Sequence, residues 1–200
     1  MKKIVCLVFF LIISCKNRGL DNPGSLKMSY KYLTEYRSTK NKNFLEKSYK
    51  ELSKTAMYRE KGLTDENYQL VVPLLMYLKK YEELETLLVK NTTMNPSKKE
   101  ITLNTIRYLK NYKKDKNVAK NYIDKNLKYI KNKIDQNPKD SLLYVDYFIM
   151  KLYKSDRITA LKEVDSMKMI NKDFSGLFYK AMLKDAIEDY PDEYLGNVSN

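Results

Sequence analysis

The chain has 200 residues, 38 basic and 25 acidic, and its formal net charge is +13. A hydrophobic fraction of 43% and a charged fraction of 32% are typical of one folded domain with a proper core and exclude a disordered chain. The sequence has no histidine, the commonest general base and metal ligand, and no glycine-rich phosphate loop, so it predicts no enzyme, no cofactor and no metal site.

The first element in chain order is an apolar segment that follows two lysines. Lys2 and Lys3 precede ten apolar residues from Ile4 to Ile13. Ten residues are too few for a helix that crosses a bilayer, which needs about 20. They suit the hydrophobic region of a secretory signal peptide, which also begins with positive charge.

The end of this segment, Ile12-Ile13-Ser14-Cys15, resembles the bacterial lipobox. The resemblance implies a signal peptide over residues 1–14, cleavage after Ser14, and acylation of Cys15 on its thiol and on the new amino terminus. Two or more acyl chains hold a protein stably on a membrane. An ordinary signal peptide, or an N-terminal helix with an incidental cysteine, remains the alternative.

Residues 15–25 are expected to form a lipidated tether, because 16–25 contain two glycines and a proline without apolar periodicity. Lys16 is not the aspartate that retains enterobacterial lipoproteins at the inner membrane. The resemblance therefore implies a lipid-anchored envelope protein at the outer membrane. The periplasmic face is expected, since the acidic stretch that sends some lipoproteins to the cell surface is missing. A single all-α domain is expected over residues 26–200.

The first half of that domain shows helical spacing of its apolar residues. Gly62 is expected to end the second helix, and Thr64 or Asp65 to cap the third. Pro73 lies within the third pattern and predicts a kink or a late start. The helices of this half are expected over 26–33, 44–57, 70–78 and 84–88.

The second half continues in the same way. Asn137-Pro138 breaks the chain, and Ser155-Asp156 predicts a turn that caps the next helix. The connections of two to six residues favour antiparallel packing of neighbouring helices. The helices of this half are expected over 101–112, 122–134, 142–153, 158–167 and 174–182.

Two windows resemble the tetratricopeptide repeat, a helix-turn-helix unit of 34 residues. Tyr68 and Tyr144 occupy the first aromatic position, and Ala160 is the small residue at which the two helices approach closely. The glycine of the family is Val72 in one window and Phe148 in the other, which implies a wider approach. The fold prediction is an all-α antiparallel helix-hairpin array, a tetratricopeptide-like solenoid, with an irregular helical bundle as the alternative.

The strongest charge feature is the basic stretch from Arg107 to Lys133, which is interleaved with tyrosines. Lysines and tyrosines suit nucleic acid in a cytosolic protein, but the signal peptide excludes that partner. A solvated helix face is one interpretation, and contact with an acidic partner or anionic lipid is the other. The candidate contact residues are Arg107, Lys110, Lys113, Lys114, Lys120, Lys128 and Lys131.

Acidic residues gather in two places, and both groups are expected to be solvated. One group lies at a helix start, where the helix dipole favours acids. The spacing of the other, near the C-terminus, matches no calcium loop. The two groups are Glu82, Glu83 and Glu85, and Asp185, Glu188, Asp189, Asp192 and Glu193.

Two functions remain open from the sequence. The first is a membrane-anchored, non-catalytic helical-repeat adaptor that binds an unidentified protein or peptide, since repeat stacks create extended binding surfaces. The alternative is a small immunity or antagonist lipoprotein that neutralises a toxin directed at the envelope. The membrane, through acyl chains on Cys15, is a partner in both.

Overall fold

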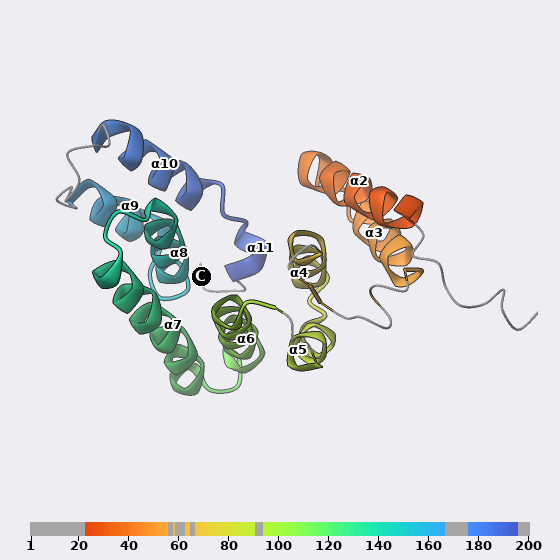
Figure 1. The fold of residues 1–200 in the computed structure, drawn as a ribbon, viewed down its shortest axis with the longest axis horizontal. Helices are drawn as coiled ribbons and strands as arrows, with labels where there is room; N and C mark the ends of the chain where they lie inside the picture. Colours follow the sequence, from red (N-terminus) through yellow and green to blue (C-terminus); the bar gives the residue numbers. More distant parts are fainter. Residues whose placement is uncertain are drawn as a thin grey trace, which may run out of the picture. The chain divides into compact units, whose positions relative to one another are not determined.

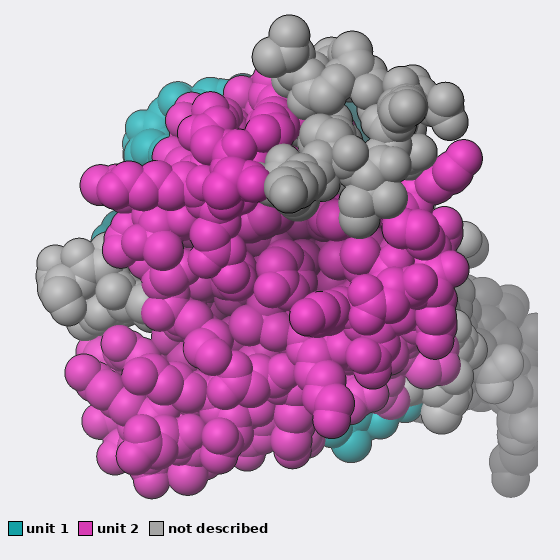
Figure 2. Space-filling view, turned by 90° about the vertical axis from the view of Figure 1, so that its left-hand side faces the viewer, with its two compact units in different colours: residues 1–95 teal, residues 96–200 magenta. Residues whose placement is uncertain are grey.

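The computed structural model describes residues 23–55, 58, 63–64, 67–90, 94–166 and 176–195 (Figure 1). Among these residues the chain forms α-helices and no strand, so the predicted all-α class is confirmed. The chain divides into two compact units, residues 1–95 and 96–200 (Figure 2). The sequence predicted a single domain over residues 26–200, so this division into two units was not expected.

The helices of each unit follow one another through short connections. The first unit contains α2 (Pro23–Thr39), α3 (Asn43–Ser53), α4 (Tyr68–Tyr77) and α5 (Tyr81–Lys90). The second unit contains α6 (Pro96–Asn111), α7 (Lys116–Gln136), α8 (Ser141–Lys151), α9 (Arg157–Ser166), α10 (Gly176–Glu188) and α11 (Asp192–Leu195). The short helix α11 follows an Asp-Tyr-Pro sequence and was not expected.

The first unit is built on the hairpin of α2 and α3. These helices pack along each other, α4 contacts both of them, and α5 packs on α4. Two small polar residues lie at the hairpin contact: the Ser29 hydroxyl donates to the Ser48 carbonyl and the Ser48 hydroxyl to the Ser29 carbonyl, each at 2.8 Å. Both serines are fully buried, so the two backbones approach closely without leaving a polar group unpaired.

Helix α4 begins later than its predicted cap. Thr64 and Asn67 bond reciprocally, each side chain accepting the other's backbone N–H, at 2.7 and 3.3 Å. This turn precedes the helix, which starts at Tyr68 and contains Pro73. The late start that Pro73 allowed is therefore not found, since the helix begins five residues before this proline and contains it. Three other predicted positions, Met57, Gly62 and Asp65, lie outside the described residues.

The second unit has one hydrophobic core that all its helices share. Helix α6 packs along α7, α7 packs on α8, and α10 packs on both α8 and α9. Ala160 and Val164 of α9 and Leu183 and Ile187 of α10 are fully buried in this core. Asp156 accepts the Thr159 backbone N–H at 2.8 Å, which confirms the predicted cap of α9. The expected end of the helix over 158–167 and the expected start of the helix over 174–182 lie outside the described residues.

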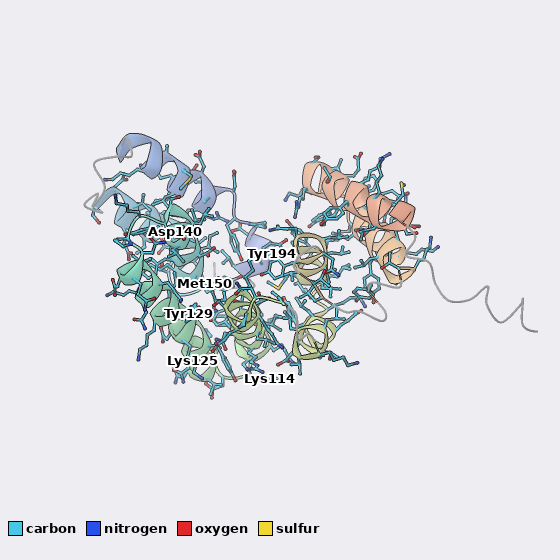
Figure 3. All side chains as sticks on the ribbon, in the orientation of Figure 1. Lys114, Lys125, Tyr129, Asp140, Met150 and Tyr194 are labelled. Carbon is cyan, nitrogen blue, oxygen red and sulfur yellow. The ribbon has the colours of Figure 1, made fainter. Side chains whose placement is uncertain are left out.

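A polar group is buried among the apolar side chains of the second unit. Asn126 of α7 is 1% exposed, and its Nδ2 donates to the Ile101 carbonyl at 2.9 Å and to the Thr105 hydroxyl at 3.3 Å. Its Oδ1 accepts from Asn104 Nδ2 at 2.9 Å. The Met150 sulfur of α8 lies 3.6 Å from the same Nδ2, in the interior of this unit (Figure 3). This network fixes the register of α6 against α7.

The C-terminal end of α10 is held by a single side chain. The guanidinium of Arg157, at the start of α9, donates to the backbone carbonyls of Ile187, Glu188 and Tyr190 and to the carboxylate of Asp192. Carbonyls at a helix end have no partner within the helix, and a cation there also interacts favourably with the helix dipole. The planar guanidinium, with five donors, therefore fastens α10 and α11 to α9.

Candidate interaction surface

The hairpin of α6 and α7 carries most of the positive charge of the second unit. Residues 96–136 include twelve basic and four acidic side chains. Helix α7 buries a stripe made of Ala119, Ile123, Asn126 and Ile130, with spacings of four and three residues. Six exposed lysines lie on the rest of this helix, so a basic face away from the buried stripe exists, as predicted.

The candidate residues on α6 differ from those on α7. Arg107 and Lys110 are only partly exposed, and both already interact with other groups of the chain. These two side chains are therefore less available for contact with an acidic partner or anionic lipid than was expected from the sequence. Periodicity places a residue on a helix, but the exposure of α6 depends on which neighbours cover it.

The other five candidates are exposed and lie on one hairpin. Lys113 and Lys114 lie in the turn between α6 and α7, and Lys114 and the α7 residue Lys125 are marked in Figure 3. Lys120, Lys128 and Lys131 lie on the outer side of α7. Within the described part of the chain, none of the five candidate lysine side chains makes an ion pair, a hydrogen bond or a ring contact. We call Lys113, Lys114, Lys120, Lys128 and Lys131 the lysine face.

The tyrosines of this stretch have a different role from the one that nucleic-acid binding requires. The Lys116 ammonium lies 5.5 Å from the Tyr112 ring centre, Lys125 lies 5.7 Å from Tyr122, and Lys133 lies 5.8 Å from Tyr129. Tyr122 and Tyr129 also pack against the core. Cation–π contact of this kind is modestly stabilising at an exposed site. These rings hold lysines that are close to them in sequence and are not a platform for bases.

Carboxylates near the lysine face offset part of its charge. Asp124 forms an ion pair with Lys154, which follows α8, so this acid is already neutralised. Asp135, near the end of α7, is exposed and lies close to Tyr144. The lysine face therefore keeps a clear positive excess.

The acidic residues of α10 are exposed, as expected. Asp185 and Glu188 are exposed on this helix, and Asp189 is exposed directly after it. Among the described residues, no three histidine, cysteine or acidic side chains come together as a metal site would require.

Glu83 was expected to be solvated at the start of α5, and that expectation was wrong. Its carboxylate accepts hydrogen bonds from the hydroxyls of Tyr49, at 2.8 Å, and of Tyr58. Lys80 Nζ lies 3.3 Å from its other oxygen and 4.2 Å from the Tyr49 ring centre. Neither tyrosine is near Glu83 in sequence, so only the packing of α3 against the rest of this unit brings them together.

This environment changes the acidities of the cluster. Burial alone would raise the pKa of Glu83, but the hydrogen bonds from Tyr58 and Tyr49 and the charge of Lys80 outweigh it and hold that pKa below its ordinary value. Burial, followed by the contact with Glu83, raises the pKa of the Tyr58 hydroxyl. A carboxylate kept ionised by two phenol hydroxyls that keep their protons is a stabilising contact and not an acid–base pair for catalysis.

Replacing Glu83 with glutamine is expected to lower the stability of the first unit by about 1–2 kcal/mol at neutral pH. The lowered pKa means that the contribution of Glu83 is complete above its ordinary value of 4.5 and is lost as the pH falls through the lowered value. The difference from wild type should therefore shrink below about pH 4.5. Urea unfolding across this pH range measures it. The exposed neighbour Glu82, changed in the same way, should shift stability little at any pH.

No helix among the described residues is long and apolar enough to span a membrane. Cys15, the predicted acylation site, lies outside the described residues.

No protein-family model matches the chain, and comparisons with the curated proteins and with the solved structures also found no match.

Proposed function

We propose that this chain is a membrane-anchored envelope lipoprotein that acts as a non-catalytic, helical-repeat adaptor for another protein or peptide. Acyl chains on Cys15 form its anchor, and residues 16–25 form the tether between the anchor and the helices. The outer membrane is its location and the periplasmic face its side. The N-terminal sequence supports the anchor, because positive charge, a short apolar run, a small residue and a cysteine occur in the lipobox order.

The order of helix packing is the observation that carries the adaptor role. In the first unit α4 packs on both helices of the preceding hairpin, and in the second unit α10 does the same with α8 and α9. At these two places a later helix covers the two helices before it, which is how helical-repeat proteins extend their surface. Ala160 is fully buried at the position that the tetratricopeptide pattern reserves for a small residue, which also supports a repeat.

The absence of catalytic groups supports a binding role. The whole sequence lacks histidine, and the carboxylate of Glu83 is occupied by tyrosine hydroxyls. What remains available on the second unit is surface charge, with the lysine face on one hairpin and acidic side chains on α10. Such a distribution suits association with charged partners more than chemistry on a bound substrate.

Replacing Cys15 with serine tests the anchor. The hydroxyl cannot form the thioether that carries the diacylglycerol, so the precursor should remain unprocessed and should not incorporate labelled palmitate. Its share in the outer-membrane fraction should fall accordingly. The control is Cys6→Ser in a chain that keeps Cys15, and this change should leave processing and fractionation intact. Normal processing and membrane recovery of the Cys15→Ser chain would mean that the anchor is assigned wrongly.

The adaptor role is tested by recovering partners from membranes that contain the acylated chain. Cross-linking before extraction, followed by mass spectrometry, should identify one envelope protein that is enriched over a Cys15→Ser strain. Recovery of a secreted toxin in its place, together with loss of toxin resistance on deletion, would favour the antagonist function instead.

A further inference from the structure

We propose that the lysine face binds the anionic headgroups of the membrane that carries the chain. This inference rests on the acyl anchor of the proposed function and adds a second, electrostatic contact to it. The chemistry it requires from its partner is a dense layer of phosphate-bearing lipids.

The geometry of α7 allows several lysines to reach one flat surface. The helix has 21 residues and is therefore about 31 Å long. Lys120 and Lys131 are eleven residues apart, which is three helical turns, so they extend from the same side. Lys128 lies between them along the helix and opposite the buried stripe. Lys113 and Lys114 extend this row at the N-terminal end of the helix.

These five side chains are available, whereas several basic residues elsewhere in the second unit are ion-paired. Lys151 pairs with Glu163, Lys184 with Asp165, and Arg157 with Asp192. No member of the lysine face has such a partner within the described residues. Asp124, the acid closest along the helix to Lys120 and Lys128, is neutralised by Lys154. The positive charge of the face is therefore not satisfied by the chain itself.

The composition of the face favours a lipid surface over an acidic protein. Protein interfaces depend on a few aromatic, apolar or arginine anchors that fill pockets and lose their water. Helix α7 contains no arginine, and its one strongly exposed apolar residue, Val118, lies on a different side from Lys120, Lys128 and Lys131. Lysine is a flexible point charge that suits diffuse phosphate layers more than shaped recognition. Charge complementarity is thus the main feature that this face offers.

The acyl anchor makes such a weak contact effective. Each lysine near an anionic leaflet strengthens binding about fivefold, and this effect falls off within a Debye length of about 10 Å at moderate salt. A lipidated chain remains next to the bilayer, so the contact forms within one complex and does not depend on protein concentration. The expected result is an orientation of the second unit with α7 toward the membrane.

The test uses the full acylated chain reconstituted in vesicles of phosphatidylcholine, with or without phosphatidylglycerol. An amine-reactive reagent followed by mass spectrometry measures the reactivity of each lysine. In the anionic vesicles, the reactivity of all five residues of the lysine face should fall about fivefold at low salt and should recover at high salt. The exposed lysines Lys42, Lys90 and Lys162 serve as internal controls and should not change.

A charge variant gives an independent measurement. With Lys120→Gln, Lys128→Gln and Lys131→Gln combined, Lys113 and Lys114 should regain their reactivity in anionic vesicles. The matched variant Lys42→Gln, Lys90→Gln and Lys162→Gln removes the same charge and should leave Lys113 and Lys114 protected. All six residues are exposed, so circular dichroism should show both variants folded.

The two levels of the proposal fail differently. Vesicle-bound chain with unchanged lysine reactivity in both lipids would overturn the lysine face while leaving the anchor in place. Salt-sensitive binding to anionic vesicles alone would support the lysine face and contradict the anchor. Protection that appears only on addition of an acidic envelope protein would overturn the lipid assignment in favour of that protein.

Discussion

Replacing Asn126 with aspartate is expected to lower the free energy of unfolding by about 3–4 kcal/mol at neutral pH. The two side chains have nearly the same shape, so the change acts through hydrogen bonding and charge. The new carboxylate oxygen would face the Ile101 carbonyl at the position where Nδ2 now donates at 2.9 Å. The Asn104 amide would remain as a donor to a charge that is almost fully buried, and the Thr105 hydroxyl could donate to it only by giving up its bond to the Ile101 carbonyl.

The pH dependence of this variant distinguishes the mechanism. Burial favours the neutral carboxyl, so the pKa of the introduced aspartate should lie above its ordinary value. Once protonated, its hydroxyl can donate to the Ile101 carbonyl, and the loss of stability should shrink as the pH falls. Urea unfolding followed by circular dichroism measures both effects. Asn121→Asp, at an exposed site on the same helix, is the control and should change stability by less than about 0.5 kcal/mol. Similar small losses at both positions would show that the network does not hold α6 and α7 together.

Replacing Ala160 with phenylalanine is expected to lower stability by about 3 kcal/mol, near the upper end of the usual overpacking range. Ala160 has no exposed surface, and its neighbours in the core include Tyr153, Val164 and Leu183. A phenyl ring at this position cannot be accommodated without moving α9 away from the rest of the unit, because protein cores have few voids.

The matched control lies two residues earlier on the same helix. Ile158 is 66% exposed, so Ile158→Phe changes an apolar residue to phenylalanine without entering the core. It should alter stability by less than about 0.5 kcal/mol. Unfolding in urea compares the two variants. If Ala160→Phe proved as harmless as the control, Ala160 would not be a packing contact, and the bundle alternative would replace the repeat interpretation.

Helix positions could be predicted from the sequence because apolar spacing reports a buried face directly. The stripe of α7 and the cap at Asp156 both follow from local patterns of this kind. The burial of Asn126 also had a signal, since it lies at helical spacing between Ile123 and Ile130. A polar residue within an apolar stripe indicates a buried polar contact, although not its partners.

The contacts that depend on distant residues could not be predicted in the same way. Glu83 lies beside Tyr49 and Tyr58, which are 34 and 25 residues earlier in the sequence, only because the first unit folds back on itself. A single sequence contains no periodicity that pairs them. For the same reason the sequence could not show that Arg107 and Lys110 are partly covered on α6, while the lysines of α7 remain exposed. Local patterns therefore predict elements, and tertiary packing determines which side chains stay available.

The order in which helices pack has a consequence for how the second unit assembles. Most of its contacts join helices that are close in sequence, with α6 on α7, α7 on α8, and α10 on α8 and α9. Such local topology lowers the chain entropy lost before contacts form and favours fast folding. Hairpins can therefore form and dock one after another in chain order. During unfolding, detachment of α10 breaks its contacts with α8 and α9 and its hydrogen bonds from Arg157. The packing of α6 on α7 does not depend on these contacts and can persist. Amide exchange should accordingly be faster in α10 than in the centre of α7.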